Sequence, residues 1–88
     1  MDTRIGVVGI VIHDPQQDAK AVNEILSEFS SIIVGRMGIP YRERSISVIA
    51  LTVDGSNDRI GAMTGKIGQL KSVTVKSALA PSEATHSK

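Results

Sequence analysis

Short apolar stretches alternate with amphipathic ones along the chain. Residues 5–12 are a run of Val, Ile and Gly that ends at His13-Asp14-Pro15, which is typical of a buried strand followed by a turn. Asp14 suits the N-cap of a helix, Pro15 its first position, and Gln17 the third residue of a capping box. Apolar residues then recur at helical spacing, at Ala19, Val22, Ile25, Leu26 and Phe29.

Three more strands and one more helix are predicted up to residue 79. The strands are expected over residues 32–37, 46–53 and 73–79, with residues 38–44 linking the first two. Asp54-Gly55-Ser56-Asn57 supplies a turn and a helix cap. The helix that follows carries its apolar residues on one face, at Ile60, Met63, Ile67 and Leu70.

The resulting order, βαββαβ, repeats weakly between its two halves. This is the α+β, ferredoxin-like plan, a four-stranded antiparallel sheet with two helices on one face and the first and third strands in the middle. We expect residues 1–79 to form this domain. Residues 80–88 are small and polar, include Pro81, and are expected to be a disordered tail.

The predicted central strands are apolar on both faces. Residues of a strand alternate between faces, and in 5–12 and 46–53 both sets are aliphatic, whereas 73–79 alternates valines with polar residues. A helix-free sheet face lined by aliphatic residues is expected to be covered by another subunit. The sequence therefore predicts a homo-oligomer, a dimer or tetramer, assembled through this face. The alternative is an apolar sheet left open to solvent.

Composition narrows the classes of function. Among 88 residues, 10 are basic and 9 acidic, a net charge of +1 that gives no strong attraction to nucleic acid, so direct DNA binding is not expected. There is no cysteine, hence neither a disulfide nor a thiol nucleophile. No apolar stretch is long enough to span a membrane and the N-terminal residues lack a signal-peptide pattern, so we expect a cytoplasmic protein without a membrane partner.

Residues with a chemical role are few. His13 lies where the first strand gives way to the helix, beside Asp14, and is a candidate ligand contact or an ordinary loop residue. The other histidine, His86, is in the tail, so no metal site and no cofactor are expected. Asp14 and Asp54 are expected at opposite ends of the sheet, as helix caps.

The second predicted helix contains a glycine stripe, Gly61, Gly65 and Gly68. Each glycine costs about 0.5–1 kcal/mol relative to alanine in a helix. Close approach of another backbone or of a ligand would explain the stripe at Gly61 and Gly65. A marginal helix whose last glycine is its C-terminal stop explains it equally well.

The segment 35–44 holds three arginines, two glycines and the only tyrosine. Arginine and tyrosine are enriched at protein interfaces, and arginine also binds carboxylates and phosphates. We favour a subunit interface over a ligand site. The residues of this segment that either role would use are Arg36, Met37, Gly38, Tyr41 and Arg42.

Three parts of the sequence carry a resemblance to a known family. They are residues 1–11 (MDTRIGVVGIV), residues 35–44 (GRMGIPYRER), and Asn57-Asp58 with Thr64-Gly65-Lys66. In these parts, and over residues 1–79 in general, the chain resembles the small regulators of the iron-only hydrogenase system.

The resemblance implies an ACT-like ferredoxin fold, similar to the C-terminal effector domain of nickel-responsive repressors. Those repressors bind nickel through His and Cys, and the absence of Cys here means that nickel sensing is not carried over. The function expected is regulation, by sensing a small molecule or docking on a partner, without enzymatic activity. An RNA-binding module and a ferredoxin-like enzyme remain as alternatives, although the central strands lack aromatics for base stacking.

Overall fold

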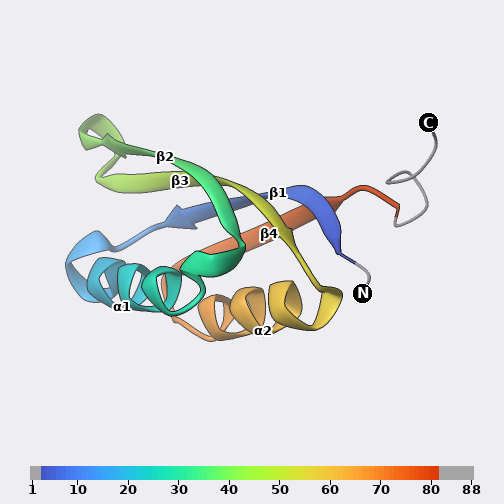
Figure 1. The fold of residues 1–88 in the computed structure, drawn as a ribbon. Helices are drawn as coiled ribbons and strands as arrows, with labels where there is room; N and C mark the ends of the chain where they lie inside the picture. The colour runs from blue at the N-terminus through green and yellow to red at the C-terminus, as the bar shows by residue number, and fades with distance from the viewer. Residues whose placement is uncertain (1–2, 82–88) are drawn as a thin grey trace.

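The strands and helices follow the order that the sequence predicts. The protein is described by a computed structural model of residues 3–81, so most of the predicted tail lies outside the described residues. Short 3-10 helices at Ser30–Ile32 and Arg42–Arg44 precede the second and third strands. The main elements are β1 (Arg4–Ile12), α1 (Pro15–Glu28), β2 (Ile33–Tyr41), β3 (Ile46–Gly55), α2 (Asn57–Gly68) and β4 (Val73–Leu79) (Figure 1).

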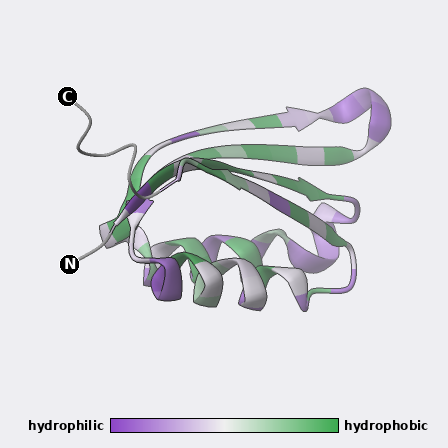
Figure 2. Cartoon of the chain, turned by 90° about the vertical axis from the view of Figure 1, so that its right-hand side faces the viewer, coloured by the Kyte–Doolittle hydropathy of each residue, from purple (hydrophilic) through white to green (hydrophobic). Residues whose placement is uncertain are grey.

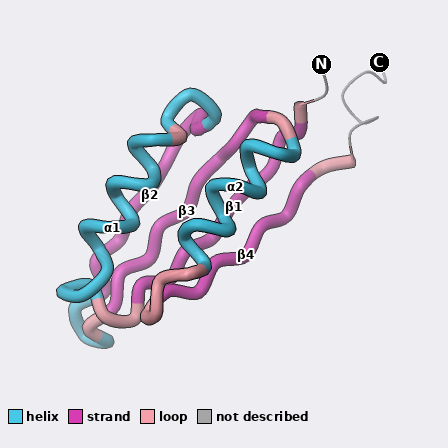
Figure 3. Tube along the Cα trace, turned by 90° about the horizontal axis from the view of Figure 1, so that it is seen from below, coloured by secondary structure: helices cyan, strands magenta, loops and turns pink. Residues whose placement is uncertain are grey.

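The four strands form one antiparallel sheet in the order β2-β3-β1-β4. β1 and β3 are the central strands, as expected. Both helices cover the same face of the sheet (Figures 1 and 3). The sandwich is therefore the predicted ferredoxin-like fold. No described element lies over the other face, which we call the open face.

The hydrophobic core lies between the helices and the sheet. Val8, Ile10 and Ile12 of β1 are each at most 1% exposed, and Met63 and Ile67 of α2 pack against the same cluster. Burial of one such side chain contributes roughly 1.5–3 kcal/mol. Apolar residues are frequent along the strands in Figure 2, and several of them, Val7 and Met37 included, are more than half exposed, so the apolar residues exceed what this one core buries.

Both helices begin at polar caps. The Asp14 carboxylate accepts the Gln17 N–H at 3.3 Å, and Pro15 is the first helical residue. The predicted capping box is only half formed, because the Asp14 N–H donates to Ser72 Oγ and not to the Gln17 side chain. The prediction of Asp54 as a cap is wrong: Ser56 caps α2, and β3 continues past Asp54 to Gly55.

β2 is longer than predicted. The sequence placed its end at Met37, but pairing with β3 continues to Tyr41 opposite Ile46. Pro40 does not stop the strand because β2 is an edge strand, where a missing N–H is tolerated. The turn closes at Ser45, the only described non-glycine residue with positive φ, 56°. The β2–β3 hairpin consequently extends beyond the helix layer (Figure 2).

Candidate functional site

The open face exposes large apolar side chains on β1 and β2. Val7 is 55% exposed and Met37 62% exposed, and three others behave in the same way, namely Ile5, Ile39 and Tyr41. The two-faced pattern predicted for β1 is confirmed, since its even-numbered positions from Val8 onward are buried. Contiguous apolar surface of this kind marks interaction sites more often than isolated exposed residues do.

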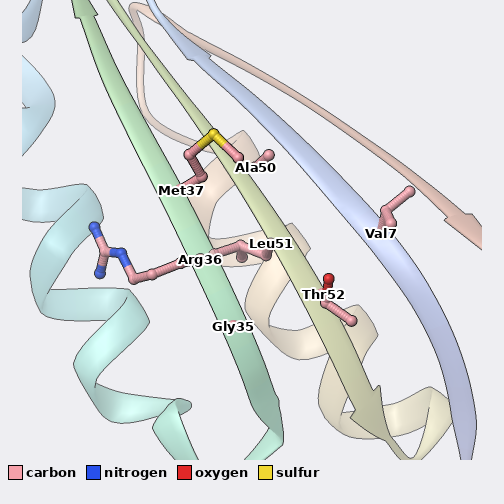
Figure 4. Close-up of a pocket in the computed structure, with 7 residues that line it drawn as sticks. All are labelled: Val7, Gly35, Arg36, Met37, Ala50, Leu51 and Thr52. Atoms are coloured by element: carbon pink, nitrogen blue, oxygen red, sulfur yellow. The ribbon is translucent and has the colours of Figure 1, made fainter.

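Small residues occupy the middle of the open face. Met37 of β2 pairs with Ala50 of β3, and Ala50 with Gly9 of β1. A hollow of about 270 Å³ lies here, with Val7 and Met37 on opposite sides (Figure 4). Small-molecule sites need polar groups that orient the ligand, and here the Arg36 side chain points away towards α1, which leaves Thr52 as the polar side chain of the lining. This apolar surface suits another protein surface better.

Polar residues border this apolar surface. Thr74 and Lys76 of β4 pair with Val11 and Gly9. Both are exposed, as the alternation of valines and polar residues in 73–79 predicted. Asp54, opposite Ile5, places a carboxylate near the other end of β1. The open face thus has a largely aliphatic interior, which also contains Thr52, with Asp54 and Lys76 at its border.

A second, polar hollow lies between the start of α1 and the turn of the β2–β3 hairpin. It measures about 510 Å³ and brings together three predicted site residues, His13, Asp14 and Arg42, with Ser45 and Ser47 also lining it. The His13 Nε2 is 3.0 Å from Thr74 Oγ1. Its opposite charges leave this hollow without a strong preference for either sign of ligand.

Asp18 ties α1 to the loop before β4. It is 6% exposed, and its Oδ2 accepts both the Ser72 hydroxyl at 2.7 Å and the Ser72 N–H at 2.9 Å. These two hydrogen bonds from Ser72 lower the pKa of Asp18 below its ordinary value. The carboxylate therefore stays ionised and holds two segments together, which is a structural role.

The remaining site residues of the segment 35–44 are divided between the two faces of the sheet. Met37 and Tyr41 lie on the open face, whereas Arg36 and Gly38 pair with the helix-side residues of β3. Arg36 Nη2 donates to Asn23 Oδ1 of α1 at 2.9 Å. Arg36 and His13 line different hollows, because the hollow that contains His13 does not include Arg36.

The glycine stripe of α2 faces open space at Gly61 and Gly65. Gly61 and Gly65 are exposed, and a Cβ built on either would meet no atom within 4 Å. Nothing in the described part of the chain approaches them closely. α2 ends at Gly68, as the C-terminal-stop interpretation expects.

The polar contacts of Asp18, Asn23 and Ser72 were missed in the sequence. Asp18 has the pattern of an ordinary first-turn acid. Ser72 lies 54 residues from Asp18. No local pattern links residues so far apart, although an aspartate in the first turn of a helix signals a possible hydrogen-bond acceptor.

Within residues 3–81 no three His, Cys, Asp or Glu residues group as metal ligands. No helix there combines the length and the apolar character needed to cross a bilayer.

A protein-family model matches most of the chain. The model of the TM1266-like family, described as "Iron-only hydrogenase system regulator, putative", matches residues 4–77. The solved structure of uncharacterized protein TM1266 from Thermotoga maritima is 38% identical, with a TM-score of 0.87 over 91% of this chain and 100% of that one. No curated protein matches the sequence.

Two more distant structures share the fold alone. A formyltetrahydrofolate deformylase from Pseudomonas putida KT2440 is 10% identical, with a TM-score of 0.61 over 88% of this chain and 29% of the enzyme. CPII from Thiomonas intermedia K12, in a structure with ADP, AMP and acetate, is 8% identical, with a TM-score of 0.50 over 92% of this chain and 93% of CPII. The ferredoxin-like architecture is thus common to proteins of different activity.

Proposed function

We propose that this chain, which belongs to the TM1266-like family, is a non-catalytic regulatory protein. It assembles as a homo-oligomer through its open face and responds to a small-molecule effector. The observation that carries the assembly is the contiguous exposed apolar surface centred on Val7 and Met37. The regulatory role follows the description of the family. Assembly provides the second state that regulation needs, because an effector can favour the assembled or the separated form.

The size of the open face supports a second copy of the chain as its occupant. Four strands about 4.8 Å apart, with roughly eight residues of about 3.3 Å each, present a face of roughly 500 Å². Two such faces packed together bury roughly 1,000 Å², the area from which specific interfaces begin. The β2–β3 hairpin, which carries Tyr41, extends the surface further.

The border charges also suit two identical copies. In a two-fold pair the same surface meets itself, so every contact occurs twice. Asp54 and Lys76 carry opposite charges, and a two-fold axis between the faces can set Asp54 of one copy against Lys76 of the other. The aliphatic interior carries no charge that would be buried without a partner.

Light scattering on matched glutamate variants tests the proposal. The parent protein is expected to be a dimer or tetramer at micromolar concentration, and Val7→Glu is expected to be a folded monomer because Val7 is exposed in the single chain. Val8→Glu is expected to unfold, since Val8 is in the core. Ala62→Glu, on the exposed side of α2, is the control that keeps its assembly.

A monomeric parent would overturn the proposal. So would a Val7→Glu variant that stays fully assembled. Loss of assembly in Ala62→Glu, with Val7→Glu unaffected, would transfer the interface from the open face to α2. Circular dichroism of each variant separates loss of assembly from loss of fold.

A further inference from the structure

Beyond Ile33, which packs against the core, the helix side of β2 is not filled by core residues. Its residues there are Arg36, Gly38 and Pro40, opposite Leu51, Ile49 and Ser47 of β3, and no β2 residue is buried. Between α1 and β2 lie two hollows of about 330 and 290 Å³, and Arg36 lines both. We call them together the α1–β2 groove. Each is near the lower limit of small-molecule pockets, roughly 300 Å³.

Arg36 crosses this groove towards α1 (Figure 4). Its one hydrogen bond to the described chain runs from Nη2 to Asn23 Oδ1, and the Asn23 amide group in turn donates to the Ala19 carbonyl. A guanidinium carries five N–H donors. Among residues 3–81 the only ion pair is Lys66 with Glu28, so Arg36 has a neutral partner and no carboxylate.

The groove offers an aliphatic floor beside this cation. Ile12 and Ile49 of the core line the hollow beside Gly38 together with Ala19, and Ser47 lines the same hollow. Gly38 leaves room there, because a Cβ at that position would meet no atom within 4 Å. An apolar surface with a few polar groups is the usual make-up of a small-molecule site.

The chemistry of the groove selects its ligand. The planar fork of an arginine binds a carboxylate through two parallel hydrogen bonds. A phosphate, with a larger charge, is usually met by several cations or by a helix N-terminus, whereas this groove has one arginine. We propose that the α1–β2 groove binds a small aliphatic monocarboxylate, whose carboxylate takes the Arg36 fork from Asn23 while its hydrocarbon part covers Ile12 and Ile49.

This inference rests on the proposed regulatory function and names the class of its effector. It needs only the single folded chain, however, because every residue of the groove comes from one copy. Light scattering on the same samples therefore separates the two proposals. Assembly without carboxylate binding would refute the proposed ligand site in the groove. Carboxylate binding without assembly would refute the proposed interface on the open face.

The test is a titration of the parent protein with isovalerate, followed in amide NMR spectra, with isovaleramide and inorganic phosphate as comparison probes. Isovalerate is expected to shift the amides of Asn23 and Gly38 saturably at millimolar concentration, and isovaleramide is expected to bind about tenfold or more weakly because it lacks the charge. Arg36→Ala is expected to weaken isovalerate binding by a similar factor. Arg44→Ala, at an exposed arginine in the 3-10 helix between β2 and β3, is the matched control and keeps the affinity.

A second variant guards against an indirect effect of removing Arg36. Gly38→Leu keeps the arginine but fills the groove, and is expected to abolish isovalerate binding while the fold stays intact. Absence of saturable shifts in the parent protein would overturn the proposal, as would equal affinity of parent, Arg36→Ala and Gly38→Leu. Tighter binding of phosphate than of isovalerate would refute the carboxylate class.

Discussion

Replacing Gly61 and Gly65 by alanine is expected to stabilise the protein. Both glycines are exposed within α2, and an added Cβ would meet nothing within 4 Å. Glycine inside a helix costs about 0.5–1 kcal/mol relative to alanine, chiefly through backbone entropy. The double variant should therefore gain roughly 1–2 kcal/mol in its free energy of unfolding.

The gain is large enough for a melting experiment. In a domain of 60–100 residues, 1 kcal/mol shifts the melting temperature by about 4–8 °C, so the double variant should melt roughly 4–16 °C above the parent. Gly55→Ala is the control of opposite sign, because its Cβ would lie 2.6 Å from Ile32 Cγ2. Overpacking of this kind costs about 1–3 kcal/mol. All three proteins are compared at one concentration, since assembly makes the melting temperature concentration-dependent.

A double variant that melts at or below the parent would refute the interpretation of Gly61 and Gly65 as free surface. If its assembly were also weakened in light scattering, the stripe would be a contact between molecules. A Gly55→Ala variant that melts higher than the parent would show that Ile32 moves aside more readily than its packing indicates.

Three further predictions concern the polar contacts. Because the hydrogen bonds from Ser72 hold the pKa of Asp18 low, the carboxylate stabilises the fold above its ordinary pKa of roughly 3.9, and this stability is lost as the pH falls through the folded-state pKa. Asp18→Asn should therefore make the unfolding free energy less dependent on acid pH in urea titrations, and an unchanged dependence would contradict this role. Ser72→Ala should lower the melting temperature, because Asp18 loses its 2.7 Å hydrogen bond; a melting curve like the parent's would make that bond energetically neutral. Glu28→Gln should change the unfolding free energy by less than about 1 kcal/mol, since the pair with Lys66 is half exposed, and a larger loss would show that the pair is better ordered than its exposure implies.

Much of the fold follows from local patterns. Alternation in the first strand separates Val8 from Val7, and the structure buries the first and exposes the second. Asp14 and Pro15 mark the start of α1, and β4 has the predicted bounds, residues 73–79. These features depend on a few neighbouring residues, so the sequence contains all the information needed to predict them.

The end of β2 and the distribution of the arginine-rich segment could not be predicted in this way. β2 continues through Pro40 because β3 pairs with it, and the irregular register between Ile33 and Gly35 sets which residues face the helices. That irregularity puts Arg36 on the helix side and Met37 on the open face. Composition alone grouped the two residues into one site, whereas pairing with a distant strand assigns them to different surfaces.

β2 links the two proposed surfaces physically. Arg36 and Met37 are consecutive residues that point to opposite sides of the strand (Figure 4), and Ile33 at its start is the one β2 residue that packs against the core. A carboxylate that takes Arg36 from Asn23 removes a side-chain bond between β2 and α1, and any resulting movement of the strand carries Met37 with it. Reciprocity then requires that assembly change the carboxylate affinity by the same factor as the carboxylate changes assembly. Isovalerate titrations below and above the concentration at which the protein assembles measure that factor, and equal affinities in both would show that β2 does not transmit the signal.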